Sequence, residues 1–169
     1  MAGSYKAMSG FANTSGTYGG FWNEVQSAKK DFPAGRGAFH GDGASGMKPE
    51  KIANVTDGLS NTIFVGERHT KTHFTRGPFW ADSFNLYTMG AVYPPVVANL
   101  QLTLVADYDR CQASINSNYC KYGWGSLHSQ GVINFVFGDG SVRNVSRNID
   151  LNILGALSTI KGKEVVPDF

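Results

Sequence analysis

Among the acidic residues and histidines of this chain, one candidate set for acid–base chemistry is Glu67, His128 and Asp139. A hydrolase built on them would need the imidazole within hydrogen-bond reach of a carboxylate, with a nucleophile or a metal ion beside it. Ser126 and Ser129 flank His128, but no nucleophile-elbow pattern surrounds either serine. We therefore expect no catalytic residue here. Instead, His128 is expected to make a hydrogen bond that fixes the start of a hairpin, and Asp139 to shape a turn.

Candidate metal ligands are sparse. Asp107, Asp109 and Asp139 are candidate Ca²⁺ ligands, but the Asp-x-Asp pair lacks the glycine and the distal glutamate of a calcium loop. His69 and His73 stand four residues apart in a segment that follows a predicted strand, where this spacing places two side chains too far apart to share one ion easily. The sequence predicts no cofactor, with a Ca²⁺ site as the alternative.

Aromatic side chains suggest a second alternative, a glycan-binding head in which rings from loops stack on sugars. Large aromatic side chains dominate core burial, however, so we expect these rings to fill the core instead. The candidates are Trp80, Tyr87, Tyr93 and Trp124.

Length and composition predict a single domain over residues 1–169. Charged residues make up 17% of the chain and glycines number 21, which favours loops and β-structure over long helices. The net charge of +2 comes with no basic stripe, so nucleic acid is not an expected partner. The sequence contains no apolar run long enough for a transmembrane helix.

The only two cysteines are Cys111 and Cys120, separated by a polar segment that we expect to be a loop. Two thiols at this spacing make a poor metal site, and the remaining interpretations are a disulfide or two buried free thiols. A disulfide would stabilise the fold by roughly 2.5–3 kcal/mol in the chain-entropy model. It would also indicate an oxidising compartment.

The densest strand pattern lies at residues 132–146. Ile133, Phe135 and Phe137 alternate with other residues at the two-residue period of a pleated strand. Asp139-Gly140 then favours a two-residue hairpin loop, with a returning strand over residues 141–146.

A second strand is predicted at Thr62 to Val65, ending at Gly66-Glu67. The polar residues before it bond readily to their own backbone, so we expect them to fix the turn that precedes the strand. These residues are Asp57, Ser60 and Asn61, and Gly58 belongs to the same turn.

The remaining elements are an edge strand within residues 1–20, a helix over 21–30, a strand over 100–105 and a closing helix. Asp150 is the expected N-cap of the closing helix, Gly162 its end, and Val165-Val166 a final short strand. The sequence thus predicts an α+β, β-rich domain with many loops. Its antiparallel sheet has a central hairpin at about 132–146 that is packed by a C-terminal helix at about 150–160.

Three separated segments resemble a bacterial domain-of-unknown-function family, number 1559. TDGLSNTIFVGE, ending at Glu67, is similar to the family's Asp-Gly-Thr-Ser-Asn-Thr segment. Residues 128–142 resemble its prepilin-processing-associated signature, a His followed by nine residues and Asp-Gly, although ten residues separate His128 from Asp139 here. The tail is similar to the family's closing helix and Gly-Gly-Glu-Val ending, with Lys163 in place of the second glycine. The resemblance spans about residues 2–169.

The resemblance implies a pilin-like or pseudopilin-like globular head, here without the N-terminal cleavage motif and apolar helix typical of the family. It also implies export, display at the cell envelope or outside the cell, and self-association or pairing with other pilin-like envelope proteins. The family's molecular function is not established. The expected function is therefore a non-enzymatic structural or interaction domain, such as a subunit of a surface filament or a secretion-linked assembly. In pilin-like proteins the apolar helix packs on the head's sheet, so we expect a strip of sheet to be exposed or covered by a neighbour.

Overall fold

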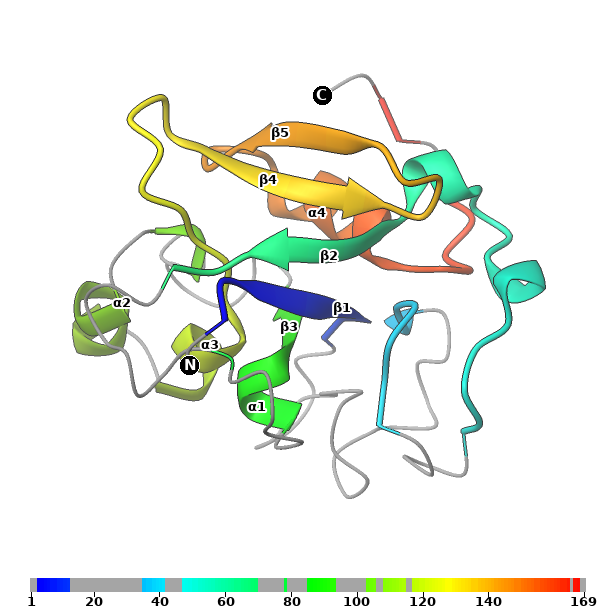
Figure 1. Cartoon of the computed structure of the whole chain (residues 1–169), viewed down its shortest axis with the longest axis horizontal. Coiled ribbons are helices and arrows are strands. Elements are labelled where there is room, and N and C mark those ends of the chain that lie inside the picture. The colour runs from blue at the N-terminus through cyan, green and yellow to red at the C-terminus, as the bar shows by residue number, and fades with distance from the viewer. Residues whose placement is uncertain are drawn as a thin grey trace.

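A five-stranded sheet organises the molecule (Figure 1). The structure, a computed structural model, describes residues 3–12, 35–41, 47–69, 78, 85–93, 103–105, 108–114, 117–164 and 166–167. The strands follow the spatial order β3-β1-β2-β4-β5. Their bounds are β1 Tyr5–Phe11, β2 Ile63–Glu67, β3 Met89–Val92, β4 Val132–Phe137 and β5 Val142–Ser146. The helices are α1 Asn85–Thr88, α2 Tyr108–Ser114, α3 Ser117–Tyr122 and α4 Leu151–Ser158.

The sheet confirms the predicted α+β class, with one difference at the N-terminus. All neighbouring strands are antiparallel except β1 and β3, which are parallel. The prediction that the first strand lies at an edge was wrong, because β1 lies between β3 and β2. Met8 and Ser9 at its centre are fully buried, which fits an interior strand.

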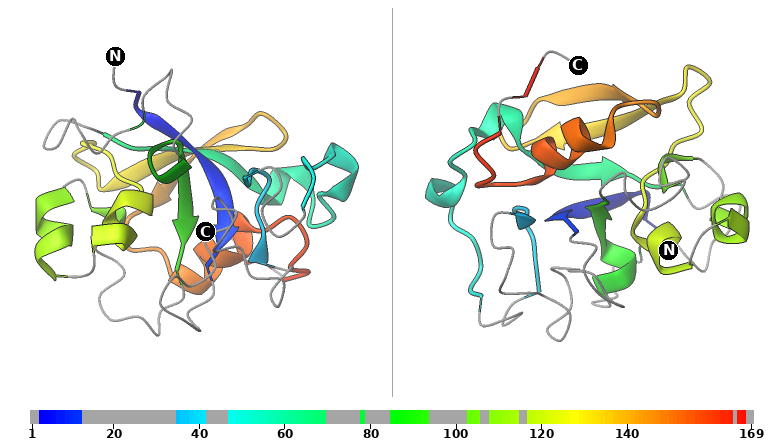
Figure 2. Two further views of the ribbon diagram at one scale, coloured as in Figure 1. Left: turned by 90° about the horizontal axis from the view of Figure 1, so that it is seen from below. Right: turned by 180° about the vertical axis from the view of Figure 1, so that it is seen from behind.

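One face of the sheet is closed by α4 and by the indole of Trp124. Seen from behind, α4 lies across the sheet (Figure 2). Leu154, Leu157 and the alternate residues Ile133 and Phe135 of β4 belong to the same buried cluster as Trp124. Glycines in the two strands under the indole make this approach possible, because a Cβ at Gly66 or Gly90 would overlap the ring.

The other face, which we call the open face, is less buried. It carries the remaining side chains of each strand, and Figure 1 is viewed from this side, with α4 behind the sheet. The burial of β4 alternates strictly, so Val132, Asn134 and Val136 point to the open face and are only half-buried. Their partners across β5 are Ser146, Asn144 and Val142, all exposed. The expected strip of exposed sheet is therefore present.

The hairpin forms as predicted, but it lies at one edge of the sheet and not at its centre, because β5 is the last strand in the spatial order. Its loop is also one residue longer than predicted. Val136 pairs with Val142, the Phe137 N–H donates to Ser141 O at 2.9 Å, and the Gly140 N–H donates to Phe137 O at 3.0 Å. Gly140 has a φ of +85°, and Asp139 has no positive φ. The loop is therefore a turn over Gly138-Asp139 closed by a left-handed glycine, in place of the predicted two-residue Asp-Gly loop.

The C-terminal helix begins where it was predicted and ends earlier. The Asp150 side chain accepts a hydrogen bond from the Asn152 N–H at 2.7 Å, which confirms it as the N-cap. The helix ends at Ser158, with Thr159 as its C-cap, and not at Gly162. Val166 is in no strand, and Val165 lies outside the described residues.

The chain after α4 is held by Asp57. Its carboxylate accepts hydrogen bonds from the Gly162 N–H at 2.7 Å, the Lys163 N–H at 3.0 Å and the Thr159 hydroxyl at 3.4 Å. The prediction that Asp57 fixes its own turn is therefore wrong for its carboxylate, which joins segments more than 100 residues apart in the sequence.

The neighbours of Asp57 do shape the local turn. Gly58 has a φ of +94°, and the Asn61 N–H donates to Gly58 O at 3.0 Å within a 3-10 turn at Leu59–Asn61. Ser60 is exposed in that turn.

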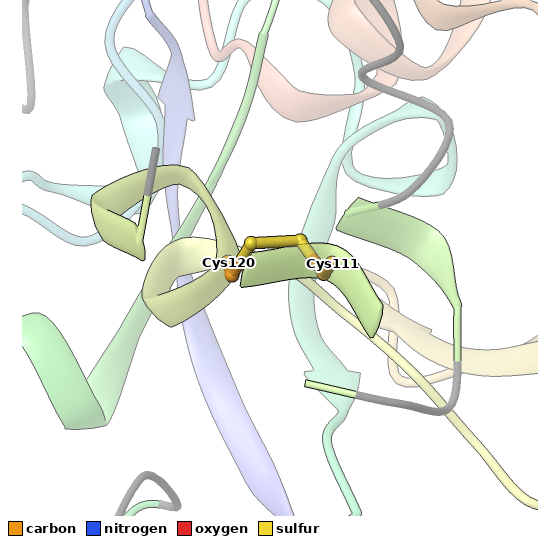
Figure 3. Close-up of a disulfide and its surroundings, with 2 residues drawn as sticks. All are labelled: Cys111 and Cys120. Carbon is orange, nitrogen blue, oxygen red and sulfur yellow. A yellow bond between two sulfur atoms is a disulfide. The ribbon is translucent and has the colours of Figure 1, made fainter. Parts of the chain in front are cut away.

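A disulfide joins Cys111 and Cys120, as the sequence predicted (Figure 3). The segment between them was predicted to be a loop, and this was wrong. Cys111 lies in α2 and Cys120 in α3, and both are buried with Tyr108 in a small cluster of their own. The disulfide and this cluster supply the packing that the local sequence alone does not indicate.

Two other predicted elements fall partly or wholly outside the described residues. The helix at 21–30 lies outside them. Of the predicted strand at 100–105, residues 103–105 are described, and Thr103 and Leu104 form a 3-10 turn instead of a strand.

Lys163 is a non-glycine residue with a φ of +64°, a backbone conformation that costs an L-residue roughly 1–2 kcal/mol. Replacing it with glycine removes this cost but adds roughly 0.5–1 kcal/mol of lost backbone entropy. We expect Lys163→Gly to leave the free energy of unfolding unchanged or to raise it by up to about 1 kcal/mol in urea denaturation. The control is Lys161→Gly, two residues away without a positive φ, which should lower it by roughly 0.5 kcal/mol or more. Equal losses in both variants would contradict the prediction.

The double variant Cys111→Ser/Cys120→Ser should lose about 2.5 kcal/mol of unfolding free energy, because the cross-link restricts the unfolded chain. Both sulfurs are buried, so the native protein should also resist a mild reductant until it unfolds. Urea denaturation and thiol labelling measure the two effects. A double variant as stable as the wild type would show that the disulfide does not stabilise the fold.

Candidate functional site

The candidate site lies where β2 changes its neighbour. Gly66 pairs with Phe135 of β4, but two residues later Arg68 forms a parallel bridge with Gly125. The Gly125 N–H donates to Glu67 O and the His69 N–H donates to Gly125 O, each at 3.0 Å. We call this place the switch point, because β2 leaves β4 here and takes the 125 segment as its partner.

The change of partner leaves backbone groups of β4 to be satisfied by side chains. Along a strand, the backbone N–H and C=O groups of successive residues point to opposite sides. The Phe137 N–H points to β5, so the backbone groups of the even-numbered residues of β4 point to β2. The Glu67 carboxylate accepts the Asn134 N–H at 2.8 Å through Oε2. The Ser126 hydroxyl donates to Val132 O and accepts the His128 N–H at 3.4 Å. Side chains thus continue the ladder where the backbone of β2 no longer does.

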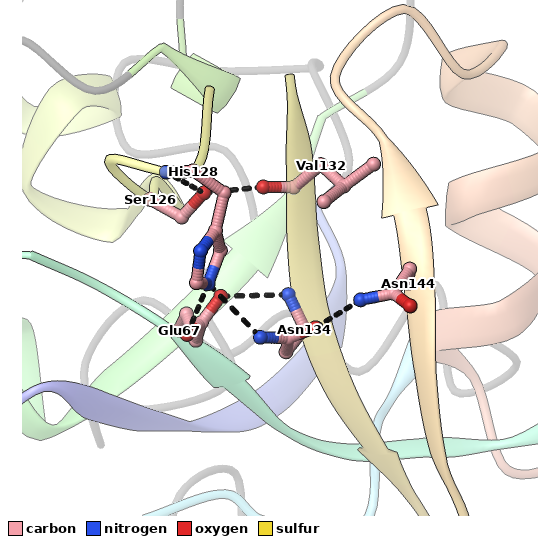
Figure 4. Close-up of polar contacts among 6 residues, drawn as sticks. All are labelled: Glu67, Ser126, His128, Val132, Asn134 and Asn144. Atoms are coloured by element: carbon pink, nitrogen blue, oxygen red, sulfur yellow. Dashed lines mark hydrogen bonds and ion pairs between the residues drawn. The ribbon is translucent and has the colours of Figure 1, made fainter. Parts of the chain in front are cut away.

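His128 and two asparagines extend this network across the open face (Figure 4). The His128 Nε2 lies 3.2 Å from Glu67 Oε1 and 3.1 Å from Asn134 Nδ2. A carboxylate only accepts hydrogen bonds, so Nε2 is the donor of the pair with Glu67. The Asn134 Nδ2 group is also a donor, so its approach to Nε2 is a close contact and not a second hydrogen bond. Asn144 of β5 bonds to the Asn134 side chain. His128 was expected to fix the start of the hairpin by a hydrogen bond, and the bond that its side chain makes is to Glu67 of β2.

A pocket of about 280 Å³ opens beside the switch point. Glu67, Ser126 and His128 line it together with Ser4, His69 and Leu127. The imidazole of His128 is 48% exposed, whereas Glu67 is largely covered. The pocket is therefore shallow and solvent-accessible, with polar groups held in fixed positions.

The structure brings together two of the three hydrolase candidates and leaves the third apart. Asp139 lies in the turn beyond the opposite end of β4, where it accepts hydrogen bonds from the Ser141 N–H at 2.9 Å and the Ser141 hydroxyl at 2.7 Å. These two hydrogen bonds lower the pKa of Asp139. Its predicted turn role is confirmed. Ser126, the serine beside the imidazole, donates its proton to Val132 O and not to His128.

The predicted metal and glycan residues do not form sites in the described part of the chain. Asp109 is exposed in the first turn of α2, Asp107 and His73 lie outside the described residues, and His69 lines the pocket. Among the residues that the structure describes, no group of three His, Cys, Asp or Glu side chains gathers as metal ligands would.

Two of the four aromatic residues proposed for sugar stacking are buried. Trp124 and Tyr93 are both buried, so neither ring can stack on a ligand, and the expectation that Trp124 fills the core is confirmed. The Trp124 ring packs at 5.5 Å from that of Phe135. Tyr87 is half-buried, and Trp80 lies outside the described residues.

Sequence analysis missed two buried cations next to the site. Lys6 is fully buried, and burial followed by repulsion from Arg68 lowers its pKa well below the ordinary value. Its ammonium group donates to Lys121 O, which ties β1 to α3. Burial also lowers the pKa of Arg68 to about 10, and its guanidinium lies 5.8 Å from the centre of the Tyr108 ring. No local pattern marks these residues, because a lysine in a strand is usually exposed.

A second cluster that the sequence did not indicate lies around Glu50. It bonds to Arg36 at 2.6 Å, to the buried imidazole of His40 at 3.3 Å and to Asn54 at 2.7 Å. Burial alone would raise the pKa of Glu50, but the bonds to Asn54, Arg36 and His40 together lower it. These contacts join residues 36–41 to residues 50–54, so their role is structural.

Comparison with known proteins identifies the family. A family described as "Protein of unknown function (DUF1559)" matches residues 2–152. The chain belongs to this family. The match includes the switch point and the hairpin turn, and it ends at Asn152, so most of α4 and the tail lie beyond it. No curated protein and no solved structure matches the chain. Within the described residues, no helix is long and apolar enough to cross a membrane.

The Glu67 carboxylate should contribute more to stability than the outer part of its network. Glu67→Ala leaves the Asn134 N–H without its charged acceptor, which should lower the free energy of unfolding by roughly 1.5–3 kcal/mol in urea denaturation. Glu67→Gln keeps an oxygen acceptor and should lose less. Asn144→Ala, at the exposed end of the network, should lose less than about 0.5 kcal/mol. Glu67→Ala and Asn144→Ala variants of equal stability would contradict this account.

Proposed function

We propose that this chain is a non-enzymatic structural or interaction domain of pilin-like type, displayed at the cell envelope or outside the cell. It associates with copies of itself or with other pilin-like proteins through the open face of its sheet. Membership of the bacterial DUF1559 family is consistent with this role but does not define it. The observation that carries the proposal is a group of apolar side chains exposed at one end of the open face.

This group, which we call the apolar half, lies near the hairpin turn. Val136 and Val142 are directly opposite one another, and Val142 is 65% exposed. The Phe64 ring lies against Gly138 of the hairpin turn and packs edge-on against Phe39, with ring centres 5.6 Å apart. Ile52, which lines the same pocket as these two rings, is 62% exposed. A shallow pocket of about 100 Å³ separates Ile52 from the two phenylalanines. Grouped exposed apolar residues on a soluble domain are typical of an interaction surface.

The disulfide supports the proposed compartment. Disulfides persist in secreted and envelope proteins and are rare in the bacterial cytosol. The Cys111–Cys120 bond therefore favours an exported location.

The polar side chains at the switch point support a non-enzymatic role. At the switch point, Glu67 accepts a hydrogen bond from a backbone N–H and Ser126 donates one to a backbone C=O. At the opposite end of β4, Asp139 accepts a hydrogen bond from the Ser141 N–H within the hairpin turn. These three side chains are thus occupied in holding the sheet and its turn together. Glu67 and His128 form a His–carboxylate pair at the pocket, and Ser126 beside them donates its hydroxyl proton to Val132 O and not to the imidazole.

Self-association can be tested by sedimentation velocity over about 1–500 µM protein, the range of weak assembly contacts. We expect the wild type to form larger species as its concentration rises. Val142→Glu and Ile52→Glu should each shift this transition at least about tenfold upward in concentration, because each places a charge in the apolar half.

The matched control for these variants is Ser146→Glu, which adds the same charge to the same face at the other end of β5 and should associate like the wild type. The proposal is wrong if the wild type stays monomeric both alone and with its pilin-like partners from the same envelope assembly. It is equally wrong if Ser146→Glu disrupts association as much as Val142→Glu does.

A further inference from the structure

A second surface lies on the open face, at the end away from the apolar half. Tyr5 of β1 is directly opposite Glu67 of β2, the Glu67 carboxylate bonds to Asn134 of β4, and Asn134 is directly opposite Asn144 of β5. We call these residues, together with His128 above them, the polar row. Three strand spacings of about 4.8 Å make the row about 14 Å long. It is a line of planar hydrogen-bonding groups that crosses the sheet.

The polar row has hydrogen-bonding capacity that the protein itself does not use. The Tyr5 side chain is 58% exposed, and its hydroxyl has no hydrogen-bond partner among the described residues. The Nδ1 atom of His128 is likewise unused by the described part of the chain, since only its Nε2 makes contacts. Asn144 uses one N–H toward Asn134, which leaves its second N–H and its carbonyl oxygen for a ligand.

The inner members of the row are held in fixed positions. Glu67 and Asn134 are fixed by the backbone ladder and by each other, and Glu67 orients the imidazole of His128. Fixed donors and acceptors lose little entropy when a ligand binds, which raises the affinity of an otherwise shallow site.

From these features we infer that the polar row and the pocket beside it bind a neutral oligosaccharide. A pyranose ring has an apolar face that stacks on an exposed aromatic ring, and an edge of hydroxyls that both donate and accept hydrogen bonds. Tyr5 supplies the aromatic face, while His128 and Asn144 supply mixed donors and acceptors. The length of the row matches a short chain of sugars. The adjoining pocket of about 280 Å³ is below the usual range for drug-sized ligands and suits a single ring.

The charges of the site favour a neutral sugar over an acidic one. The polar row and the pocket contain one carboxylate, Glu67, and no lysine or arginine. An acidic sugar or a phosphate group would meet this carboxylate without a cation to pair with it. The polar row itself contains no exposed aliphatic side chain, and the adjoining pocket contributes one, Leu127, which is 55% exposed. The site therefore offers a smaller aliphatic surface than the apolar half does.

The test measures the binding of defined sugars to the whole chain by NMR. The probes are cellohexaose, chitohexaose and laminarihexaose, with an acidic hexagalacturonate for comparison. We expect at least one neutral hexasaccharide to shift the signals of Tyr5, His128 and Asn144 with a Kd of about 10 µM to 1 mM. The acidic probe should bind at least about tenfold more weakly.

Variants separate this site from the rest of the face. Tyr5→Ala and Asn144→Ala should each weaken sugar binding at least about tenfold, and Tyr5→Phe, which keeps the ring, should weaken it less. Ser146→Ala on the same strand and Val142→Glu in the apolar half should bind like the wild type. The inference is overturned if no neutral hexasaccharide binds, or if binding survives Tyr5→Ala and Asn144→Ala. It is also overturned if signals at the row change with protein concentration and not with sugar, which would make the row a protein contact. Self-association is measured separately, so failure here leaves the proposed function standing.

Discussion

The hydrogen bond from the Asn134 N–H to the Glu67 carboxylate is the constraint on which the open face depends. At the switch point β2 gives up β4 and takes Gly125 as its neighbour, so a backbone donor of β4 would be left unpaired. A charged oxygen replaces the missing backbone acceptor at 2.8 Å. Because Glu67 is then fixed, it also fixes His128, and the start of the hairpin is placed relative to β2. Glu67 and His128, whose residue types are also found in catalytic groups, thus hold the strands of the sheet in position.

This constraint divides the two faces of the sheet between different tasks. The closed face is covered by Trp124, by α4 and by the buried side chains of β4. It accepts the indole because positions 66 and 90 are glycines. The open face keeps its side chains accessible and has an apolar half near the hairpin turn and a polar row near the switch point. The disulfide between α2 and α3 stabilises the segment that leads into Trp124 and the pocket. The proposed assembly surface and the proposed sugar site therefore lie on the same sheet without sharing residues.

Local patterns predicted the elements that depend on local chemistry. The alternation of Ile133, Phe135 and Phe137 indicated β4, and the Asp150 cap indicated α4, because neither signal requires distant contacts. The remaining features depend on distant partners. The Asp57 carboxylate binds the chain near Lys163, and Lys6 is buried against α3, contacts that no short sequence window contains. The two helices of the Cys111–Cys120 segment escaped prediction for the same reason, since the disulfide and tertiary packing outweigh weak local propensity. The sequence indicated Glu67 and His128 as candidate acid–base residues, but it did not predict that their side chains are in contact.

The most direct test of the central claim follows the Asn134 amide by NMR as acid neutralises the Glu67 side chain. The account predicts slow hydrogen exchange of this amide in the native protein. It also predicts a proton shift that moves in step with the Glu67 side-chain carbon signal during the titration, because the hydrogen bond weakens when the carboxylate is protonated. In Glu67→Ala the amide should exchange much faster while those of Phe135 and Val145 stay protected. An Asn134 amide that exchanges rapidly in the wild type, or whose signal is indifferent to Glu67, would contradict the account.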